Sequence, residues 1–158
     1  MEQEAELAAW LTARSERSIE TACARVFLAG DVAWKLKRNK DLGYADFSTA
    51  ARRKWALDRE LEFNAAAAPD IYRRVRHITR EADGAFAWEG AGETVDYALE
   101  MRRFDDSAVL GAAPELLDAE MAEQLGRTIA GFHAAAPLRP LGGITALAFT
   151  IGSNAELI

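Results

Sequence analysis

Residues 18–38 constrain the fold of this chain more than any other segment does. Two stretches rich in apolar residues, 18–29 and 32–38, flank the dipeptide Gly30-Asp31, which favours a tight reversal of the backbone. The segment therefore predicts two antiparallel strands joined by a short turn.

The second strand of this hairpin carries two lysines on one face. Side chains of a strand alternate between its two faces, so Ala33, Lys35 and Lys37 share one face. Trp34 and Leu36 point the other way. A small residue next to a lysine leaves room for a flat base beside a cation that faces the phosphates of the same ligand. This face is a candidate nucleotide site, although a strand lysine is usually just a solvated side chain.

The composition indicates a globular chain and argues against some classes of function. The 158 residues suffice for one domain with a core, because a chain of this length buries roughly 70% of its unfolded surface. Half of the residues are apolar and 28% are charged. The net charge of −6 disfavours a nucleic-acid-binding patch on residues 35–54, although basic residues gather there and permit a local anion site.

The cysteine and histidine content gives no sign of a disulfide or a metal site. Cys23 is the single cysteine, which excludes an internal disulfide and fits a reducing cytoplasm. His77 and His133 lack metal-ligand spacing, and His133 is interpreted as a structural residue. Residues 1–14 do not resemble a signal peptide, and no apolar run approaches the roughly 20 residues of a membrane helix. We expect a soluble, cytoplasmic protein with no membrane or nucleic-acid partner.

The order of patterns along the chain predicts an α+β fold. Residues 19–101 are expected to form an antiparallel sheet of about five strands with one helix packed on a face, followed by helices only. Ser48 or Thr49 is the candidate N-cap of the packed helix. The predicted elements are, in order, a helix over 2–14, strands over 18–29 and 32–38, a helix over about 49–67, strands over 72–80, 85–89 and 95–101 with an Asp83-Gly84 turn between the first two, and helices over 118–135 and 142–158.

The helix over 49–67 has one apolar face with a carboxylate at its edge. Leu57, Leu61, Asn64 and Ala68 recur at helical spacing and define the face expected to be buried. Glu60 lies beside this face, where its carboxylate can reach inward. The alternative is an exposed Glu60 that pairs with a neighbour on the helix surface.

Several segments carry a resemblance to a known family. They are Val26-Phe-Leu-Ala-Gly-Asp-Val-Ala-Trp-Lys-Leu-Lys37, Asp46-Phe-Ser-Thr49, Arg59-Glu-Leu61, Ala68-Pro-Asp-Ile-Tyr72, Met101-Arg-Arg-Phe104 and Ile129-Ala-Gly-Phe-His-Ala134. In this order and at these distances, over about residues 19–136, they resemble the kinase-like aminoglycoside phosphotransferases. The most similar branch is uncharacterised, and its kinase-like part is often fused to a P-loop ATPase domain. The resemblance implies the N-terminal lobe of a protein-kinase-like fold in residues 1–101, and the truncated start of a helical C-terminal lobe in 102–158.

The resemblance assigns roles to three of the charged residues. Lys35 resembles the lysine that kinases set against the α- and β-phosphates of the nucleotide. Lys37, two residues on and on the same face, is the rival for this role. Glu60 resembles the helix glutamate that pairs with this lysine. We therefore expect the ammonium group of Lys35 within about 4 Å of the Glu60 carboxylate.

The resemblance also implies contacts to the adenine base and to the phosphates, through residues whose identity is less specific to the family. The backbone groups of Glu100 and Met101 resemble the hinge that holds the adenine edge, and Ala33 leaves space for the base. The segment 18–23 contains no glycine where a kinase has its glycine-rich loop, so phosphate contacts would come from backbone N–H groups or from the hydroxyl of Thr21.

The catalytic half of the family pattern is absent from this sequence. Phosphoryl transfer uses an acidic residue for the acceptor hydroxyl together with Asn and Asp ligands for Mg²⁺. The family carries these in a His-Gly-Asp-type loop and a later Asp of its second lobe, and no His-Gly-Asp occurs here. The chain is thus expected to be the ATP-binding part of a kinase-like small-molecule phosphotransferase, catalytically incomplete, with no catalytic or metal-ligating residue of its own. The alternative is a non-catalytic kinase-fold module that binds a protein.

Expected partners follow from this interpretation. They are a nucleotide as ATP, accompanied by Mg²⁺ whose ligands belong to the second lobe, and an acceptor small molecule that the sequence does not identify. The helix over 118–135 presents Leu125, Ile129 and Phe132, which other elements would cover in a complete enzyme. The isolated chain is therefore expected to form oligomers, exchange elements or be poorly soluble.

Overall fold

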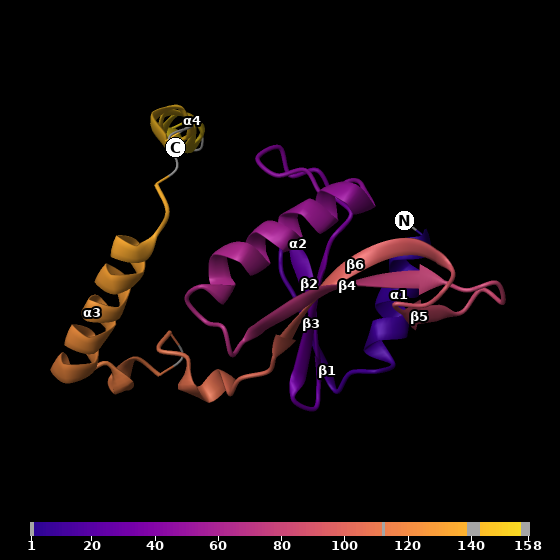
Figure 1. Cartoon of the computed structure of the whole chain (residues 1–158), viewed down its shortest axis with the longest axis horizontal. Coiled ribbons are helices and arrows are strands. Elements are labelled where there is room, and N and C mark those ends of the chain that lie inside the picture. The colour runs from indigo at the N-terminus through magenta and orange to yellow at the C-terminus, as the bar shows by residue number, and fades with distance from the viewer. Residues whose placement is uncertain (1, 112, 139–142, 156–158) are drawn as a thin grey trace. The chain divides into compact units, whose positions relative to one another are not determined.

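The computed structural model describes residues 2–111, 113–138 and 143–155. It divides the chain into two compact units, Met1–Val109 and Leu110–Ile158. The first unit contains a sheet with two helices, and the second unit is helical (Figure 1). The α+β class predicted from the sequence is confirmed.

The sheet of the first unit is antiparallel throughout and has six strands in the order β1-β2-β3-β6-β4-β5. The sequence pattern predicted about five. Strand β6 lies between β3 and β4, so the last strand along the chain occupies the middle of the sheet. The strands are β1 (Arg17–Glu20), β2 (Ala24–Ala29), β3 (Val32–Lys37), β4 (Tyr72–Arg80), β5 (Phe86–Trp88) and β6 (Glu93–Arg102).

The additional strand arises because the stretch 18–29, predicted as one strand, is a hairpin of β1 and β2. Ile19 pairs with Val26, and the backbone N–H of Thr21 donates to the carbonyl of Ala24 over 2.8 Å. The Thr21 hydroxyl also donates to this carbonyl and accepts from the N–H of Ala24. A threonine hydroxyl can replace backbone partners in this way, so the turn forms without the Gly or Pro that marks most turns in a sequence.

The two turns that the sequence did mark are present. Gly30 between β2 and β3 has a φ of +54° and Gly84 between β4 and β5 has a φ of +84°, values that favour glycine. In the second turn Glu81 N–H donates to the carbonyl of Ala85 over 2.8 Å. Both predicted hairpins are therefore confirmed.

Helix α1 (Glu2–Thr12) covers one face of the sheet. Its Leu7 and Leu11 are buried in one cluster with Phe27, Leu36 and Ile78 from three strands. Trp10 of the helix extends this cluster, with its ring centroid 5.3 Å from that of Trp88, which in turn lies 5.4 Å from the ring of Trp34. Trp34 and Leu36 thus face α1, as strand alternation predicted.

Helix α2 (Ala50–Ala65) lies along the sheet and packs against β4 and β6 (Figure 1). Of the two predicted N-cap candidates, Ser48 and Thr49, it is Thr49 that caps the helix, and its side chain accepts a hydrogen bond from Arg52 N–H. Leu57 of the predicted apolar face is fully buried. Leu61 is only half-buried, and Ala68 lies beyond the end of the helix, so the apolar face is shorter than predicted.

A buried ion pair joins α2 to the sheet, and the sequence pattern gave no sign of it. Arg53 Nε donates to both carboxylate oxygens of Asp96 over 2.9 and 3.1 Å, and its Nη1 donates to the carbonyl of Phe47. Both charged side chains are more than nine-tenths buried. The helix is therefore anchored at its first turn to β6 and to the loop that precedes the helix.

The second unit contains α3 (Ala119–Ala135) and α4 (Gly143–Ala155), preceded by a short 3₁₀ turn, η2 (Pro114–Leu116). Asp118 caps α3 by accepting from Met121 N–H over 2.8 Å, and the predicted helix over 118–135 is confirmed. The ends of the helix predicted over 142–158 lie outside the described residues. In the part of the chain that the structure describes, no helix is long and apolar enough to cross a membrane.

Candidate functional site

The centre of the candidate site is the carboxylate of Glu60, which binds two lysines at once. Lys35 Nζ donates to Glu60 Oε1 over 2.5 Å, and Lys37 Nζ donates to Glu60 Oε2 over 2.9 Å. The predicted contact between Lys35 and Glu60 is therefore present. From the sequence, Lys35 and Lys37 were alternative candidates for the phosphate-binding lysine. In the structure each of them binds one oxygen of the same carboxylate.

The secondary structure explains why these three groups meet. Lys35 and Lys37 are two residues apart on β3, so their side chains leave the same face of the sheet at neighbouring positions. Helix α2 packs against this same side of the sheet with the face that contains the buried Leu57. Glu60 lies one helical turn after Leu57, at the edge of this packed face. The alternative of a Glu60 confined to the helix surface is thereby excluded.

The charges in this cluster are not balanced. Burial alone would raise the pKa of Glu60, but hydrogen bonds from Lys35 and Lys37, together with their positive charges, outweigh it and hold this pKa below its ordinary value of 4.5. Glu60 is therefore ionised at neutral pH. Two ammonium groups face one carboxylate, and the excess positive charge suits an anionic ligand.

The two lysines differ in how open they are to solvent. The exposed fraction of the side chain is 26% for Lys35 and 10% for Lys37, against 14% for Glu60. Lys37 also lies over the ring of Phe47, with Nζ 5.2 Å from the ring centroid. Phe47 is itself buried and its carbonyl is bound by Arg53. Lys35 is thus the more accessible cation and Lys37 the more firmly held one.

Ala33 lies two residues before Lys35 on the same face of β3. It is buried and pairs with Leu28 of β2 and Met101 of β6. The position two residues before Lys35 is therefore filled by a small, buried side chain.

Glu100 and Met101 lie within the ladder of a central strand. Glu100 pairs with Trp34 and Arg74, and Met101 pairs with Ala33 and Tyr72. In an antiparallel sheet the backbone groups of a strand with two neighbours are used by those neighbours. Arg103, the first residue after β6, still donates its N–H to the carbonyl of Asp31, so backbone groups outside this pairing begin after Arg103. The side chain of Glu100 has a different role.

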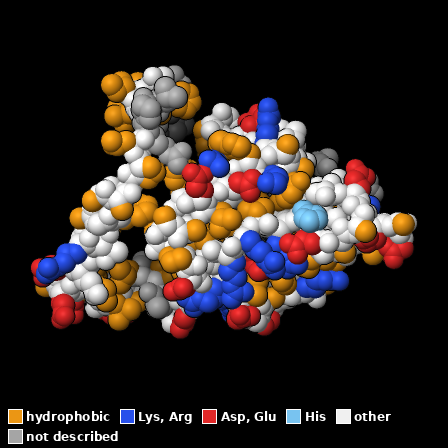
Figure 2. Space-filling view, viewed as in Figure 1, with side chains coloured by type: hydrophobic (Ala, Val, Ile, Leu, Met, Phe, Trp, Pro, Cys, Tyr) orange, Lys and Arg blue, Asp and Glu red, His pale blue; other side chains and the backbone are white. Residues whose placement is uncertain are grey.

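The carboxylate of Glu100 belongs to an ion-pair network on the face of the sheet opposite the lysines. It accepts from Arg74 Nε over 3.3 Å and from Arg76 Nη1 over 3.0 Å, and Arg76 also pairs with Glu89 and lies over the ring of Trp88. Figure 2 shows basic and acidic side chains intermixed over the first unit. The predicted nucleotide residues are therefore divided between two faces of the sheet.

Thr21 lies in the β1–β2 turn, within the stretch that was predicted as one strand, and its hydroxyl is used there by Ala24. Its carbonyl accepts from Arg38 Nη1 over 3.3 Å. Arg38 also pairs with Glu20. Arg38 directly follows β3, so its contacts connect the β1–β2 turn to the end of β3.

A polar hollow of about 470 Å³ opens where the chain leaves β6. Arg103 N–H donates to the carbonyl of Asp31, and the side chains of Arg17 and Asp106 pair at 3.3 Å, so the segment after β6 runs past the β2–β3 turn to β1. The hollow is lined by Arg17, Gly30, Asp31, Arg103, Phe104, Asp105 and Asp106. Asp31 and Lys35 are four residues apart, or roughly 13 Å along an extended strand.

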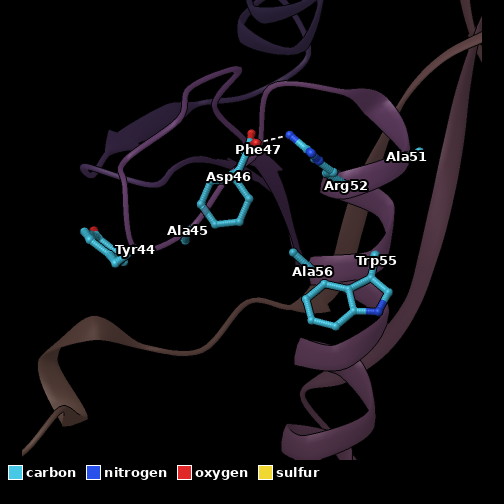
Figure 3. Close-up of a pocket in the computed structure, with 8 residues that line it drawn as sticks. All are labelled: Tyr44, Ala45, Asp46, Phe47, Ala51, Arg52, Trp55 and Ala56. Carbon is cyan, nitrogen blue, oxygen red and sulfur yellow. Dashed lines mark hydrogen bonds and ion pairs between the residues drawn. The ribbon is translucent and has the colours of Figure 1, made fainter. Parts of the chain in front are cut away.

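A second hollow, of about 620 Å³, lies between the outer side of α2 and the loop before it (Figure 3). Tyr44 and Trp55, both largely exposed, stand at its opposite ends, and Asp46 pairs with Arg52 at its rim. Its lining is completed by Ala45, Phe47, Ala51 and Ala56. The sequence analysis gave this surface no role.

His133 was interpreted from the sequence as a structural residue. His133 lies on α3 in the second unit, beside Phe132. Among the residues that the structure describes, no group of three or more His, Cys, Asp or Glu could hold a metal ion.

Comparisons with known proteins identify relatives without assigned functions. The chain is 32% identical over 93 residues to "Uncharacterized protein Rv2004c" of Mycobacterium tuberculosis and, to the same extent, to "Uncharacterized protein Mb2027c" of Mycobacterium bovis. The match covers 59% of this chain and 17% of each relative, so the chain spans less than a fifth of the length of the curated relatives it matches. Neither a family model nor a solved structure matches the chain.

Proposed function

We propose that the first unit binds ATP, with the Lys35 ammonium group against the phosphates. The observation that supports this most directly is the 2.5 Å ion pair between Lys35 on β3 and Glu60 on α2. The pair fixes a lysine that is still a quarter exposed, in a cluster with excess positive charge. A lysine held in this way meets a phosphate without first being ordered, and such preorganisation raises affinity.

The base and the phosphates of the nucleotide can be placed along strand β3. In this proposal the base lies over Ala33, and its edge meets the backbone of residues 104–106, at the hollow that opens after β6. The phosphates then extend along β3 toward Lys35. The adenine contact that the sequence assigned to Glu100 and Met101 thereby moves a few residues along the chain, because the backbone of β6 is used on both sides.

We further propose that this unit is the N-terminal lobe of a kinase-like aminoglycoside phosphotransferase fold. The support is the antiparallel sheet with a packed helix, and the glutamate of that helix paired with a lysine of the third strand. The proposal covers nucleotide binding by this chain and not the transfer of a phosphoryl group. It gives Mg²⁺ no ligand among the described residues, and it leaves the acceptor molecule unspecified.

Titration calorimetry of the whole chain with ATP and Mg²⁺ tests the proposal. Lys35→Met should weaken ATP binding about tenfold or more, since it removes a charge-assisted hydrogen bond. Its free energy of unfolding should change by only about 0–1 kcal/mol, because Glu60 keeps Lys37 as a partner.

Lys54→Met is the matched control. Lys54 also pairs with a carboxylate, that of Asp58, and lies over an aromatic ring, that of Tyr97, but it takes no part in the Glu60 cluster. Its replacement should leave ATP affinity unchanged. A wild-type chain that binds no ATP, or equal losses in the two variants, would rule out the proposed site.

A protein-interaction module is the second candidate function, and one observation favours it. Leu125, Ile129 and Phe132 of α3 are each about 40% exposed and lie on one side of the helix. A chain that binds no nucleotide but associates with a protein through this face would support the second candidate over the first.

A further inference from the structure

We propose that Lys37 is a positioning residue, which holds Glu60 in place when Lys35 turns toward a bound phosphate. This inference rests on the proposed ATP site. It concerns a residue that the sequence offered only as a substitute for Lys35.

The first step is the state of Glu60 when a phosphate arrives. Each carboxylate oxygen has one lysine, Lys35 at 2.5 Å and Lys37 at 2.9 Å. A phosphate competes for the Lys35 ammonium and weakens one of these two contacts. Glu60 is largely buried, and a buried carboxylate that loses its only counter-charge is strongly destabilised. With Lys37 in place, the carboxylate still has a partner.

The second step is the difference between the two lysines. Lys37 is nine-tenths buried and is fixed on a second side by the ring of Phe47. In the sheet, Lys37 pairs with Ala24, the first residue of β2, next to the turn that the Thr21 hydroxyl closes. Lys35 is more exposed, and among the described residues it lies over no aromatic ring. The geometry therefore separates a more exposed cation, which a ligand can reach, from a more buried one.

The third step is the consequence for binding. Because Lys37 acts on the ligand through Glu60, its contribution should exist only while residue 60 is charged. A lysine that touches the phosphate directly would contribute whatever residue 60 is. The two roles thus differ in a quantity that can be measured.

A double-mutant cycle on ATP affinity measures it. Lys37→Met should weaken ATP binding roughly fivefold in the wild-type background, less than Lys35→Met does. In a Glu60→Gln background, whose amide needs no counter-charge, the same change should have almost no effect. Lys37→Arg, which restores a cation, should recover most of the wild-type affinity, and Lys54→Met should have no effect in either background.

Carbon-13 NMR of the Glu60 carboxyl group with saturating ATP gives a readout that a merely structural role would not move. In the wild-type complex, where the phosphate engages Lys35, the pKa of Glu60 should stay below its ordinary value because Lys37 remains, and it should rise in Lys37→Met. Without nucleotide both lysines lower this pKa, so either single change should raise it. Among the described residues, Lys35 and Lys37 form the ion pairs of this carboxylate.

Each outcome decides a separate point. An equal loss of affinity from Lys37→Met in both backgrounds would assign Lys37 to direct phosphate contact and overturn the positioning role. No loss in either background would overturn it as well. A wild-type chain that binds no ATP would overturn the proposed function itself, and this inference with it.

Discussion

At the scale of single residues, the chemistry of this chain is concentrated in one carboxylate shared by two lysines. The pattern Ala-Trp-Lys-Leu-Lys predicted that Ala33, Lys35 and Lys37 share a face, and strand geometry alone guarantees this. It could not predict how the lysines divide their contacts. That division depends on Glu60, which is 25 residues from Lys35 along the chain.

The Glu60 cluster makes stability depend on pH in a defined direction. The pKa of Glu60 is lower in the folded chain than its ordinary value of 4.5, so its ionised form stabilises the fold. This contribution is fully present above pH 4.5 and is lost as pH falls through the lowered folded-state pKa. Glu60→Gln should thus cost stability at pH 7 and cost progressively less below pH 4.5, as measured by urea unfolding at a series of pH values.

Glu93→Gln, at the exposed start of β6, is a suitable control for this measurement. A stability difference between wild type and Glu60→Gln that stays constant from pH 7 to pH 3 would contradict the role given to the carboxylate.

At the scale of elements, the position of α2 decides whether Glu60 can reach the two lysines of the candidate site. The helix was predictable from its Thr49 cap and its apolar face. Its attachment to the sheet was not, because Arg53 and Asp96 are 43 residues apart and each resembles a surface residue in the sequence. Burial raises the pKa of Asp96, and the hydrogen bonds and charge of Arg53 oppose that rise.

Breaking this ion pair should destabilise the first unit strongly. Arg53→Met leaves a buried carboxylate at Asp96 without its cation, and such a loss costs about 3 kcal/mol. The neighbouring Arg52, whose pair with Asp46 is much more exposed, is the matched control, and Arg52→Met should cost less than about 1 kcal/mol. Chemical denaturation of the two variants measures both values.

Adding Asp96→Asn to Arg53→Met should recover part of the lost stability, because a neutral amide needs no counter-charge. Similar losses in Arg52→Met and Arg53→Met would mean that the buried pair does not anchor the helix.

At the scale of the whole molecule, the chain combines a unit with its own core and a helical unit with an open apolar face. The first unit buries Leu7, Leu11, Phe27 and Ile78 in one cluster. The second unit leaves Leu125 and Ile129 about 40% exposed. Exposed apolar patches are common sites of association between proteins, so this face is a candidate for one.

The chain should therefore associate at micromolar concentration, and sedimentation velocity measures this. Leu125→Glu combined with Ile129→Glu should shift the chain toward monomer, since both changes place a charge on the apolar face of α3. Gln124→Glu, which adds a charge beside this face, is the control and should change little. A wild-type chain that sediments as a single monomer would contradict the expectation.

The sequence by itself determined the local features of this protein. The Gly30 and Gly84 turns, the Thr49 and Asp118 caps and the shared face of the two lysines all depend on neighbouring residues and on backbone sterics, so they were predictable. These features were enough for the α+β class and for most element boundaries.

The tertiary structure alone decided how distant segments combine. It split residues 18–29 into two strands because the Thr21 hydroxyl closes a turn, and it placed β6 at the centre of the sheet, which uses the backbone of Glu100 and Met101. It also brought Glu60 between two lysines and buried Arg53 on Asp96. Such contacts join residues far apart in the chain, and their free energy depends on burial and on the surrounding charges. These quantities exist only once the chain is packed.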